Sequence, residues 1–293
     1  MRAKGFSRRE FLAVAAGLPA VDWASLGTGD LPKTDAGGGK IPVGLELYSV
    51  RDELKRDPEG TVKAVAQMGY QCVEFYAPYF DWSEGQTKAI RKLLDDLGIK
   101  CYSTHNSAAY FSRENLPRAR DMNLILGSRY LVMASSDPKT TLDEWGKFAD
   151  ALNAAADQLE AAGLQAGYHN HQPEFTLLDG RRPMQILAEK TKPSVMLQLD
   201  VGTCLEAGAD PVAWIRAHPG RIRSIHCKDW APGAGKGYQV LFGEGIADWK
   251  AIFTAAENGG GVQFYLVEQE GSRFSELDTT SKCLEAFRRT HAA

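Results

Sequence analysis

The sequence lacks the features that mark several common functional classes. Lys and Arg total 34 against 37 Asp and Glu, for a net charge of −3, and no clustered basic face for nucleic acid is indicated. The five cysteines are odd in number and show no CxxC spacing, so no disulfide framework is expected. The short apolar run near the N-terminus is too short to remain as a helix across a bilayer core of about 30 Å.

The first 40 residues resemble an export leader followed by a linker. Ser7 to Leu12 reads SRREFL and precedes a mild apolar run, residues 13–18, a pattern typical of twin-arginine signals, whose substrates cross the membrane folded. We expect residues 1–25 to be this signal, 26–40 a Gly-rich linker, and 41–293 the folded domain. The mature protein is then periplasmic or secreted, with a retained anchor as the alternative.

Four short apolar runs each end on a potential metal ligand. Their bounding Gly, Pro and polar residues favour strands, and the runs end at His169, Asp200, His226 and Glu268. The first run continues through Asn170 and His171 to Glu174. Such strand ends converge only when all the strands point the same way, as they do in a parallel barrel.

From residue 41 onward, strand-like and helix-like segments alternate, eight of each. The strand-like runs begin at Val43, Cys72, Lys100, Tyr130, Ala166, Val195, Ile222 and Gln263. This alternation predicts a single α/β domain, a (β/α)8 TIM barrel, whose usual size is about 250 residues. A doubly wound open sheet is the alternative, but the Gly-rich phosphate turn expected after its first strand is absent.

The strand ends predict a site for one divalent ion, Mn2+, Co2+, Mg2+ or Zn2+. Imidazole nitrogen and carboxylate oxygen bind such ions. Asp200, His226 and Glu268 are the expected ligands, each on a different strand. The fourth ligand is either Glu174 or His169. We favour Glu174, with His169 and His171 touching substrate or supporting the ligands from behind.

Six segments together resemble the sugar phosphate isomerase/epimerase family of xylose isomerase-like barrels, from about Ile41 to the C-terminus. They are GLELYSVRD (44–52), YHNH (168–171) with Glu174-Phe175, LDVG (199–202), HCKD (226–229), GEG (243–245) with Asp248-Trp249, and Val267-Glu268. The resemblance implies a metal site built from Asp200, His226, Glu268 and a strand-five residue. Many members carry a glutamate at the end of strand five. Here that position holds His169, which argues against symmetrical two-carboxylate epimerisation.

These residues favour proton abstraction next to a carbonyl. A metal bridging two sugar oxygens stabilises the enediolate while a base removes the carbon-bound proton. Glu268 is predicted to bind metal and act near that carbon. The other expected proton-transfer or oxyanion-stabilising groups are His169, His171, His105 and Lys228. The expected substrate contacts are Tyr48, Glu74, Asn106, Asn170 and Trp230.

The fate of the enediolate decides the reaction. Reprotonation gives a sugar isomerase or epimerase, whereas loss of a β-oxygen gives a sugar dehydratase or keto-glycoside lyase. Two other functions are less well supported. A non-catalytic carbohydrate-binding barrel would have little need of these metal ligands. A metal-dependent nuclease would need a basic groove for the phosphate backbone, which the sequence does not indicate. Without an Arg/Lys cluster, an unphosphorylated sugar or keto-sugar is the expected small-molecule partner. Nucleic acid and a lasting membrane span are not expected, and homo-oligomer formation stays open.

Overall fold

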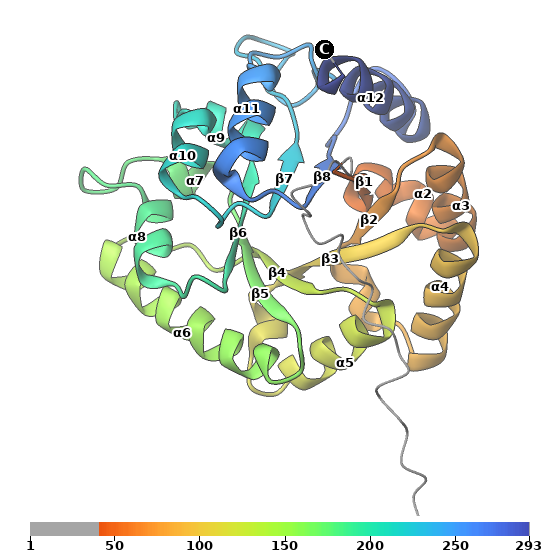
Figure 1. Cartoon of the computed structure of the whole chain (residues 1–293), viewed down its shortest axis with the longest axis horizontal. Coiled ribbons are helices and arrows are strands. Elements are labelled where there is room, and N and C mark those ends of the chain that lie inside the picture. The colour runs from red at the N-terminus through yellow and green to blue at the C-terminus, as the bar shows by residue number, and fades with distance from the viewer. Residues whose placement is uncertain (1–40, 293) are drawn as a thin grey trace, which may run out of the picture.

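Eight parallel strands close into a barrel in the computed structural model, which describes residues 41–292. Figure 1 shows the strands at the centre and the helices around them. The predicted TIM barrel is therefore confirmed. The predicted signal, residues 1–25, and linker, residues 26–40, lie outside the described residues. The strands are β1 (Val43–Glu46), β2 (Cys72–Phe75), β3 (Lys100–Ser107), β4 (Tyr130–Ser135), β5 (Gln165–His169), β6 (Met196–Asp200), β7 (Ser224–Cys227) and β8 (Phe264–Val267).

Helices on the outside return the chain from the end of one strand to the start of the next. Short 3-10 helices follow the first three strands, at Leu47–Val50, Ala77–Asp81 and Ala108–Phe111. The α-helices are α2 (Arg51–Arg56), α3 (Pro58–Met68), α4 (Glu84–Leu97), α5 (Leu116–Leu126), α6 (Leu142–Glu160), α7 (Gln172–Phe175), α8 (Pro183–Lys190), α9 (Val201–Glu206), α10 (Pro211–Ala217), α11 (Trp249–Ala255) and α12 (Glu276–His291).

Local sequence signals set the ends of several helices. Ser83 accepts a hydrogen bond from the backbone of Gln86, whose side chain bonds back to Ser83, and this capping box starts α4. Gly98 ends the same helix at φ 68°, a conformation that costs glycine little. Pro58 occupies the first turn of α3. A serine before the helix, a glycine after it and a proline in the first turn predict helix ends from the sequence alone, and the structure confirms these ends.

Two strand ends differ from what the sequence predicts, which is a first strand that runs to Tyr48 and a third strand that stops at Thr104. β1 stops at Glu46, because the chain turns there into a 3-10 helix that leaves Tyr48 40% exposed. β3 runs on to Ser107, and His105 and Asn106 lie inside it because both continue the pairing with β4. The short helices α2, α7 and α9 were not predicted.

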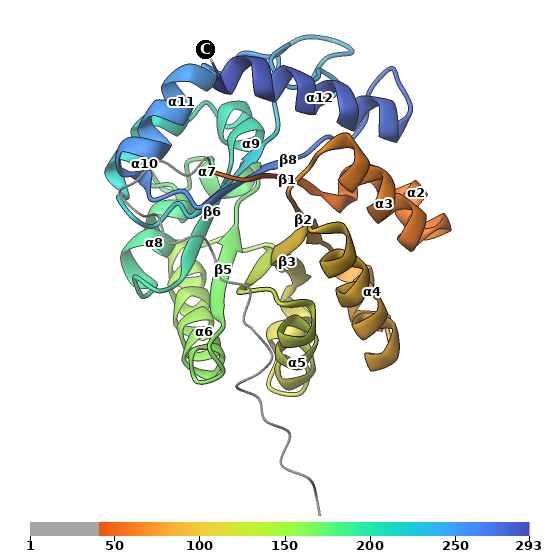
Figure 2. The ribbon, with the colours of Figure 1, turned by 45° about the vertical axis from the view of Figure 1, so that its right-hand side comes forward.

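The barrel interior and the space between barrel and helices are packed separately. Seven buried side chains form one cluster, which includes Phe264, Leu266 and Met196. A larger cluster packs the outward-facing strand residues against the helices. α12 contacts both α11 and α3 and so joins the two ends of the described chain, as Figures 1 and 2 show. Among the described residues, no helix is long and apolar enough to cross a membrane.

Candidate functional site

Alternation along the strands carries polar side chains into the barrel at its C-terminal end. On β8 the inner face holds Phe264 and Leu266 in the apolar cluster, and two residues further along comes Glu268. On β6, Met196 belongs to the same cluster, and two-residue steps lead to Gln198 and Asp200. Because successive side chains point to opposite faces, each strand delivers its polar group just above the apolar layer.

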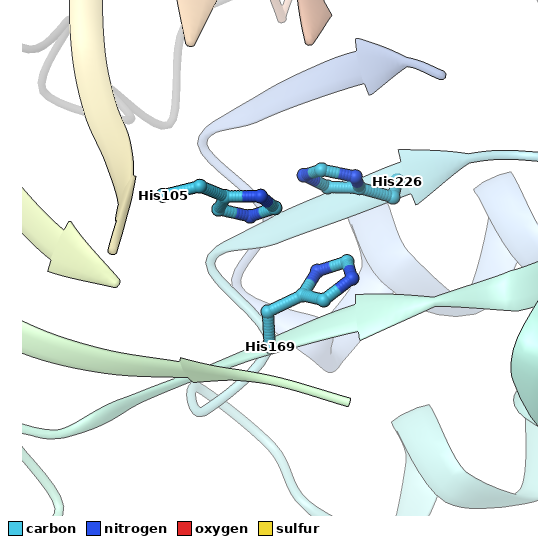
Figure 3. A group of neighbouring side chains, drawn as sticks. All are labelled: His105, His169 and His226. Carbon is cyan, nitrogen blue, oxygen red and sulfur yellow. The ribbon is translucent and has the colours of Figure 1, made fainter. Parts of the chain in front are cut away.

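Three histidines from different strands meet at the centre of this polar layer. Figure 3 shows His105 from β3, His169 from β5 and His226 from β7 with their rings facing one another. The ring centroids of His105 and His226 lie 4.8 Å apart in a stacked pair. The His169 ring is 4.5 Å from each of the other two.

The expected ligands Asp200, His226 and Glu268 lie together, and His169 completes the group. One ligand atom from each of the four residues lies within 4.8 Å of the others. All four side chains are buried, and Glu268, the most accessible, is 6% exposed. Two imidazoles and two carboxylates are a donor set that suits a transition metal ion or zinc.

Glu174, preferred from the sequence as the fourth ligand, lies outside this group. Its Oε1 accepts a hydrogen bond from the Tyr168 hydroxyl at 2.8 Å, and its Oε2 accepts one from the His171 backbone at 2.8 Å. β5 ends at His169 and the chain turns into α7, so Glu174 points back toward Tyr168, which packs on the outside of the barrel. The geometry therefore favours His169 over Glu174 as the fourth ligand.

Gln198 fixes the ring orientation of His169. The Gln198 amide nitrogen donates to Glu74 Oε2 at 3.0 Å, so its oxygen must face the histidines. That oxygen lies 3.0 Å from His169 Nδ1, which donates to it. His169 Nε2 is thereby left with its lone pair, 3.8 Å from Asp200 Oδ2.

His226 is held between two carboxylates. Its Nε2 lies 2.8 Å from Glu74 Oε1 and its Nδ1 lies 2.6 Å from Glu268 Oε2. Burial acts to lower the pKa of His226, but the hydrogen bonds to Glu268 and Glu74 outweigh it and raise that pKa to about 9. His226 and Glu268 would therefore have to release the proton that they share before they could hold a metal ion.

His169 has the opposite tendency. Burial, together with the neighbouring His226 and His105, lowers the pKa of His169 well below its usual value. A neutral imidazole is the form that binds a metal ion. His169 thus needs no deprotonation to act as a ligand.

The inner layer holds four buried carboxyl groups, and a buried lysine lies against two of them. Glu46, Glu74, Asp200 and Glu268 are each 6% exposed or less. Lys228, 1% exposed, lies 2.8 Å from Asp200 Oδ2, 3.5 Å from Glu268 Oε1 and 2.7 Å from Glu270 Oε1. Burial acts to lower the pKa of Lys228, but these carboxylates hold it well above its usual value. The two imidazoles and two carboxylates of His169, Asp200, His226 and Glu268 nevertheless form a donor set that fits a divalent metal ion once His226 gives up its proton.

The predicted substrate contacts Asn106 and Asn170 are instead used within the protein. Asn106 accepts a hydrogen bond from Tyr79 at 2.6 Å and donates to the Thr104 backbone oxygen at 2.8 Å. Asn170 accepts from the Asp200 backbone at 2.9 Å and donates to Thr203 at 2.9 Å. Both side chains are buried and have structural contacts. They hold the strand ends in place.

The other predicted residues lie around the histidine cluster. Glu74 lies at its base and contacts two of the rings. His171 is exposed, with its ring 5.0 Å from that of His169. Tyr48 is exposed and makes an edge contact with Tyr76, with ring centroids 5.4 Å apart. Trp230 is half-buried in the loop after β7.

Sequence reasoning missed two inner-layer residues, Glu46 and Gln198. A signal for Glu46 was present, because β1 is an apolar run ending in a carboxylate like the runs of β6 and β8. Gln198 lies two residues before Asp200 and so shares its face of β6. A glutamine inside an apolar strand is itself a sign of a hydrogen-bonded interior position.

Asp229 organises the loop that follows β7. Its carboxylate accepts hydrogen bonds from the backbones of Trp230 and Gly243, both at 2.9 Å, and from the Trp249 indole at 2.9 Å. A Cβ at Gly245 would lie 2.0 Å from Asp229 Oδ1, so only glycine fits there. The GEG and Asp248-Trp249 segments thus serve to fold this loop beside the site.

Comparison with known proteins identifies the family. Residues 62–289 match the family described as xylose isomerase-like TIM barrel. The chain belongs to that family. A sugar phosphate isomerase/epimerase from Parabacteroides distasonis ATCC 8503 is similar in structure, with a TM-score of 0.72, 24% identity, and coverage of 89% of this chain and 98% of the other. At this identity the likeness shows the fold.

The similar curated proteins carry different activities. An inosose dehydratase of Geobacillus thermodenitrificans (strain NG80-2) is 25% identical over 221 residues, which cover 63% of this chain and 74% of the relative. An L-ribulose-5-phosphate 3-epimerase UlaE of Salmonella paratyphi C (strain RKS4594) is 24% identical over a stretch that covers 64% of this chain and 71% of the relative. The chain spans 49% of an inosose dehydratase of Lacticaseibacillus casei. The family thus includes both sugar epimerases and dehydratases.

Proposed function

We propose that this protein is a metal-dependent enzyme that acts on a sugar or keto-sugar by removing a proton from the carbon next to a carbonyl. The observation that carries the proposal is the buried group of His169, Asp200, His226 and Glu268 at the C-terminal end of the barrel. A similar structure described as IOLI protein with a bound zinc atom supports the choice of a metal, at 17% identity and a TM-score of 0.66.

The residues divide the work between them. A divalent ion, when bound, would polarise the carbonyl and offset negative charge on its oxygen. Glu268 lies at the edge of the group with 6% exposure and is placed to take the carbon-bound proton. Lys228, held by Asp200 and Glu270, supplies a buried ammonium that can donate a hydrogen bond to a negatively charged oxygen. The surrounding buried side chains keep bulk water away from the exchange.

Elimination is the second candidate outcome, and one observation favours it. In this chain the end of β5 carries His169, whose Nδ1 is occupied by Gln198, and not a carboxylate facing Glu268. A single basic carboxylate together with the ammonium of Lys228 suits loss of a β-oxygen better than symmetrical proton exchange on two faces. The relatives named inosose dehydratase are consistent with this reading.

The test is to incubate the metal-loaded protein in heavy water with inosose, L-ribulose, D-fructose and 3-keto-D-glucose. Mass spectrometry and proton NMR would report exchange of a carbon-bound hydrogen, formation of an isomer, or loss of water. We expect exchange with at least one keto-sugar, abolished in Glu268→Gln. Metal-loaded protein that exchanges no hydrogen in any of these compounds would argue for a carbohydrate-binding barrel instead.

We also propose export by the twin-arginine route, supported by SRREFL at residues 7–12. Replacing Arg8 and Arg9 together with lysine should keep a folded reporter fusion in the cytoplasm. Unchanged export of the double variant would contradict this proposal without affecting the one on catalysis.

A further inference from the structure

Where β1 and β3 reach the site, the Glu46 side chain has no hydrogen-bond partner among the described residues, and His105 has one ring nitrogen that is not used. Both carboxylate oxygens of Glu46 are unpaired, although the side chain is 1% exposed. His105 uses Nε2 to contact Gln198 Oε1 at 2.6 Å and Glu74 Oε1 at 2.9 Å. Its Nδ1 then faces Glu46 Oε1 at 3.7 Å, which is too long for a hydrogen bond.

A buried carboxyl group without a hydrogen-bond partner costs about 1–3 kcal/mol in typical cases. Such a group indicates that a partner is missing from the free protein. The partner must be able to donate a hydrogen bond or carry positive charge, and it must fit between Glu46 and His105.

A second metal ion does not suit this position. Glu46, Glu74 and His105 are close enough to form a ligand group, but Glu74 is already fully used. Its Oε1 contacts His105 and His226, and its Oε2 accepts from Gln198 at 3.0 Å and from Ser103. Two free ligands remain, fewer than the three or four protein ligands that hold a metal ion in most zinc sites.

A hydroxyl group suits the position well. It donates one hydrogen bond to a carboxylate, and its oxygen can meet an imidazole nitrogen at the same time. An oxygen about 2.7 Å from both groups spans their 3.7 Å separation without strain. Sugars and cyclitols carry such hydroxyls on every ring carbon that is not oxidised or substituted.

Aromatic side chains follow the ends of β1 and of its neighbour β2. Tyr48 lies two residues after Glu46 and Tyr76 two residues after Glu74, and their rings meet edge to face. Tyr48 is 40% exposed, so part of its ring is open to a ligand. Tyrosine rings beside a carboxylate provide the mixture of apolar and polar contact that sugar rings need.

We propose that Glu46 and His105 bind a hydroxyl group of the substrate. This hydroxyl is distinct from the substrate oxygens that would face His169, Asp200, His226 and Glu268. This inference rests on the proposed function and narrows its substrate class. The substrate is a polyhydroxylated sugar or cyclitol with a free hydroxyl at the position that reaches Glu46. The analogue with hydrogen in place of that hydroxyl should be disfavoured by about 100-fold or more.

The first test needs no substrate. In Glu46→Gln an amide replaces the buried acidic group, and its oxygen can accept a hydrogen bond from His105 Nδ1. The metal-loaded, ligand-free variant should therefore melt a few degrees above wild type. The matched variant is Glu174→Gln, another buried carboxylate at the same end of the barrel whose two oxygens both accept hydrogen bonds. It should melt below wild type.

Two results of this first test would overturn the inference. A lower melting temperature of Glu46→Gln with loss of a second equivalent of metal would show that a cation occupies the position. A lower or unchanged melting temperature with the metal content intact would show that a proton already satisfies Glu46 in the free protein.

The second test uses myo-inositol, D-glucose and D-fructose as probes in thermal shift measurements on metal-loaded protein. At least one should stabilise wild type and not Glu46→Gln. Equal stabilisation of both proteins, or of neither, would contradict a hydroxyl-binding position here. If these tests succeed while no sugar exchanges hydrogen in heavy water, the binding position stands and the proposed chemistry fails.

Discussion

Glu74 Oε1 on β2 lies 2.8 Å from His226 Nε2 on β7, and the other nitrogen of the same ring lies 2.6 Å from Glu268 Oε2. One carboxylate thus orients the imidazole from behind while the other faces it from the front. Metal-binding histidines commonly have such an acceptor behind the ring, which fixes the tautomer and makes the coordinating nitrogen more basic.

Replacing Glu74 with alanine should weaken metal binding about 10- to 100-fold without changing the one-ion stoichiometry. The physical reason is that His226 and His105 both lose an acceptor for Nε2. Competition with a fluorescent chelator would measure the affinity. Gln263→Ala is the matched control, because the Gln263 side chain accepts a hydrogen bond from Tyr130 and lies just before the start of β8, at the opposite end of the barrel from the site. Equal metal affinities of Glu74→Ala and wild type would show that Glu74 does not support the metal-binding histidines.

The metal content of purified protein should separate the ligands from their neighbours. Asp200→Ala and His226→Ala should lose the ion, and His169→Ala should bind it more weakly, since each removes one member of the buried group. Glu174→Gln should retain about one ion because Glu174 lies outside the group. Elemental analysis by mass spectrometry gives the result. Loss of metal from Glu174→Gln at full stability would restore Glu174 as the fourth ligand.

The metal-free protein should lose stability as the pH rises from neutral to about 9. Burial and the bonds to Glu268 and Glu74 leave His226 with a pKa of about 9, above the unfolded value of about 6.5. The stabilisation is therefore complete below about pH 6.5 and disappears as pH passes through about 9, by on the order of 3 kcal/mol. Urea denaturation in a chelator would measure it.

His226→Gln is the control for this pH dependence. It should show a much flatter profile between about pH 6.5 and about 9. Adding metal to wild type should also flatten the profile, because the metal replaces the proton on Nδ1. A wild-type profile as flat as that of His226→Gln would mean that His226 is neutral in the metal-free protein.

Asp229→Ala should lower the free energy of unfolding by about 2–4 kcal/mol. The change leaves the Gly243 backbone and the Trp249 indole without an acceptor in a partly buried loop. Lys236→Gln, an exposed change in the same loop, should stay within about 0.5 kcal/mol of wild type. Chemical denaturation compares the three proteins. A cost for Asp229→Ala no larger than for Lys236→Gln would show that the loop does not depend on Asp229.

The five cysteines should be inert in the folded protein. All of them are unpaired and buried within residues 41–292, and burial raises the pKa of Cys101, Cys72 and Cys227 above the usual thiol value. Thiolates are the reactive form, so an aromatic disulfide reagent should label them only after unfolding. Rapid labelling of a native thiol would contradict this placement.

Much of the fold and part of the site were predictable from the sequence. The apolar runs ending at Asp200, His226 and Glu268 predicted both the strands and the meeting of their ends, because run length and bounding residues are local properties. The glycines after α4 and α5 marked helix ends for the same reason. Glu74 was expected near the substrate, but its place behind two histidines depends on distant strands.

The sequence by itself determined that eight strands would form, where most of them end, and which side chains would stand at the C-terminal face. Two-residue alternation and short-range capping are written in neighbouring residues, and they need no information from the rest of the chain.

Only the tertiary structure decided which of these side chains meet. His169, and not Glu174, lies with Asp200, His226 and Glu268. The reason is that β5 ends at His169 and the chain then turns into α7, which carries Glu174 away from the group. Glu46 on β1 lies opposite His105 on β3, with no hydrogen-bond partner within residues 41–292, because both strands send side chains into the interior of the closed barrel. Contacts of this kind depend on the register and closure of the whole barrel, which no local pattern specifies.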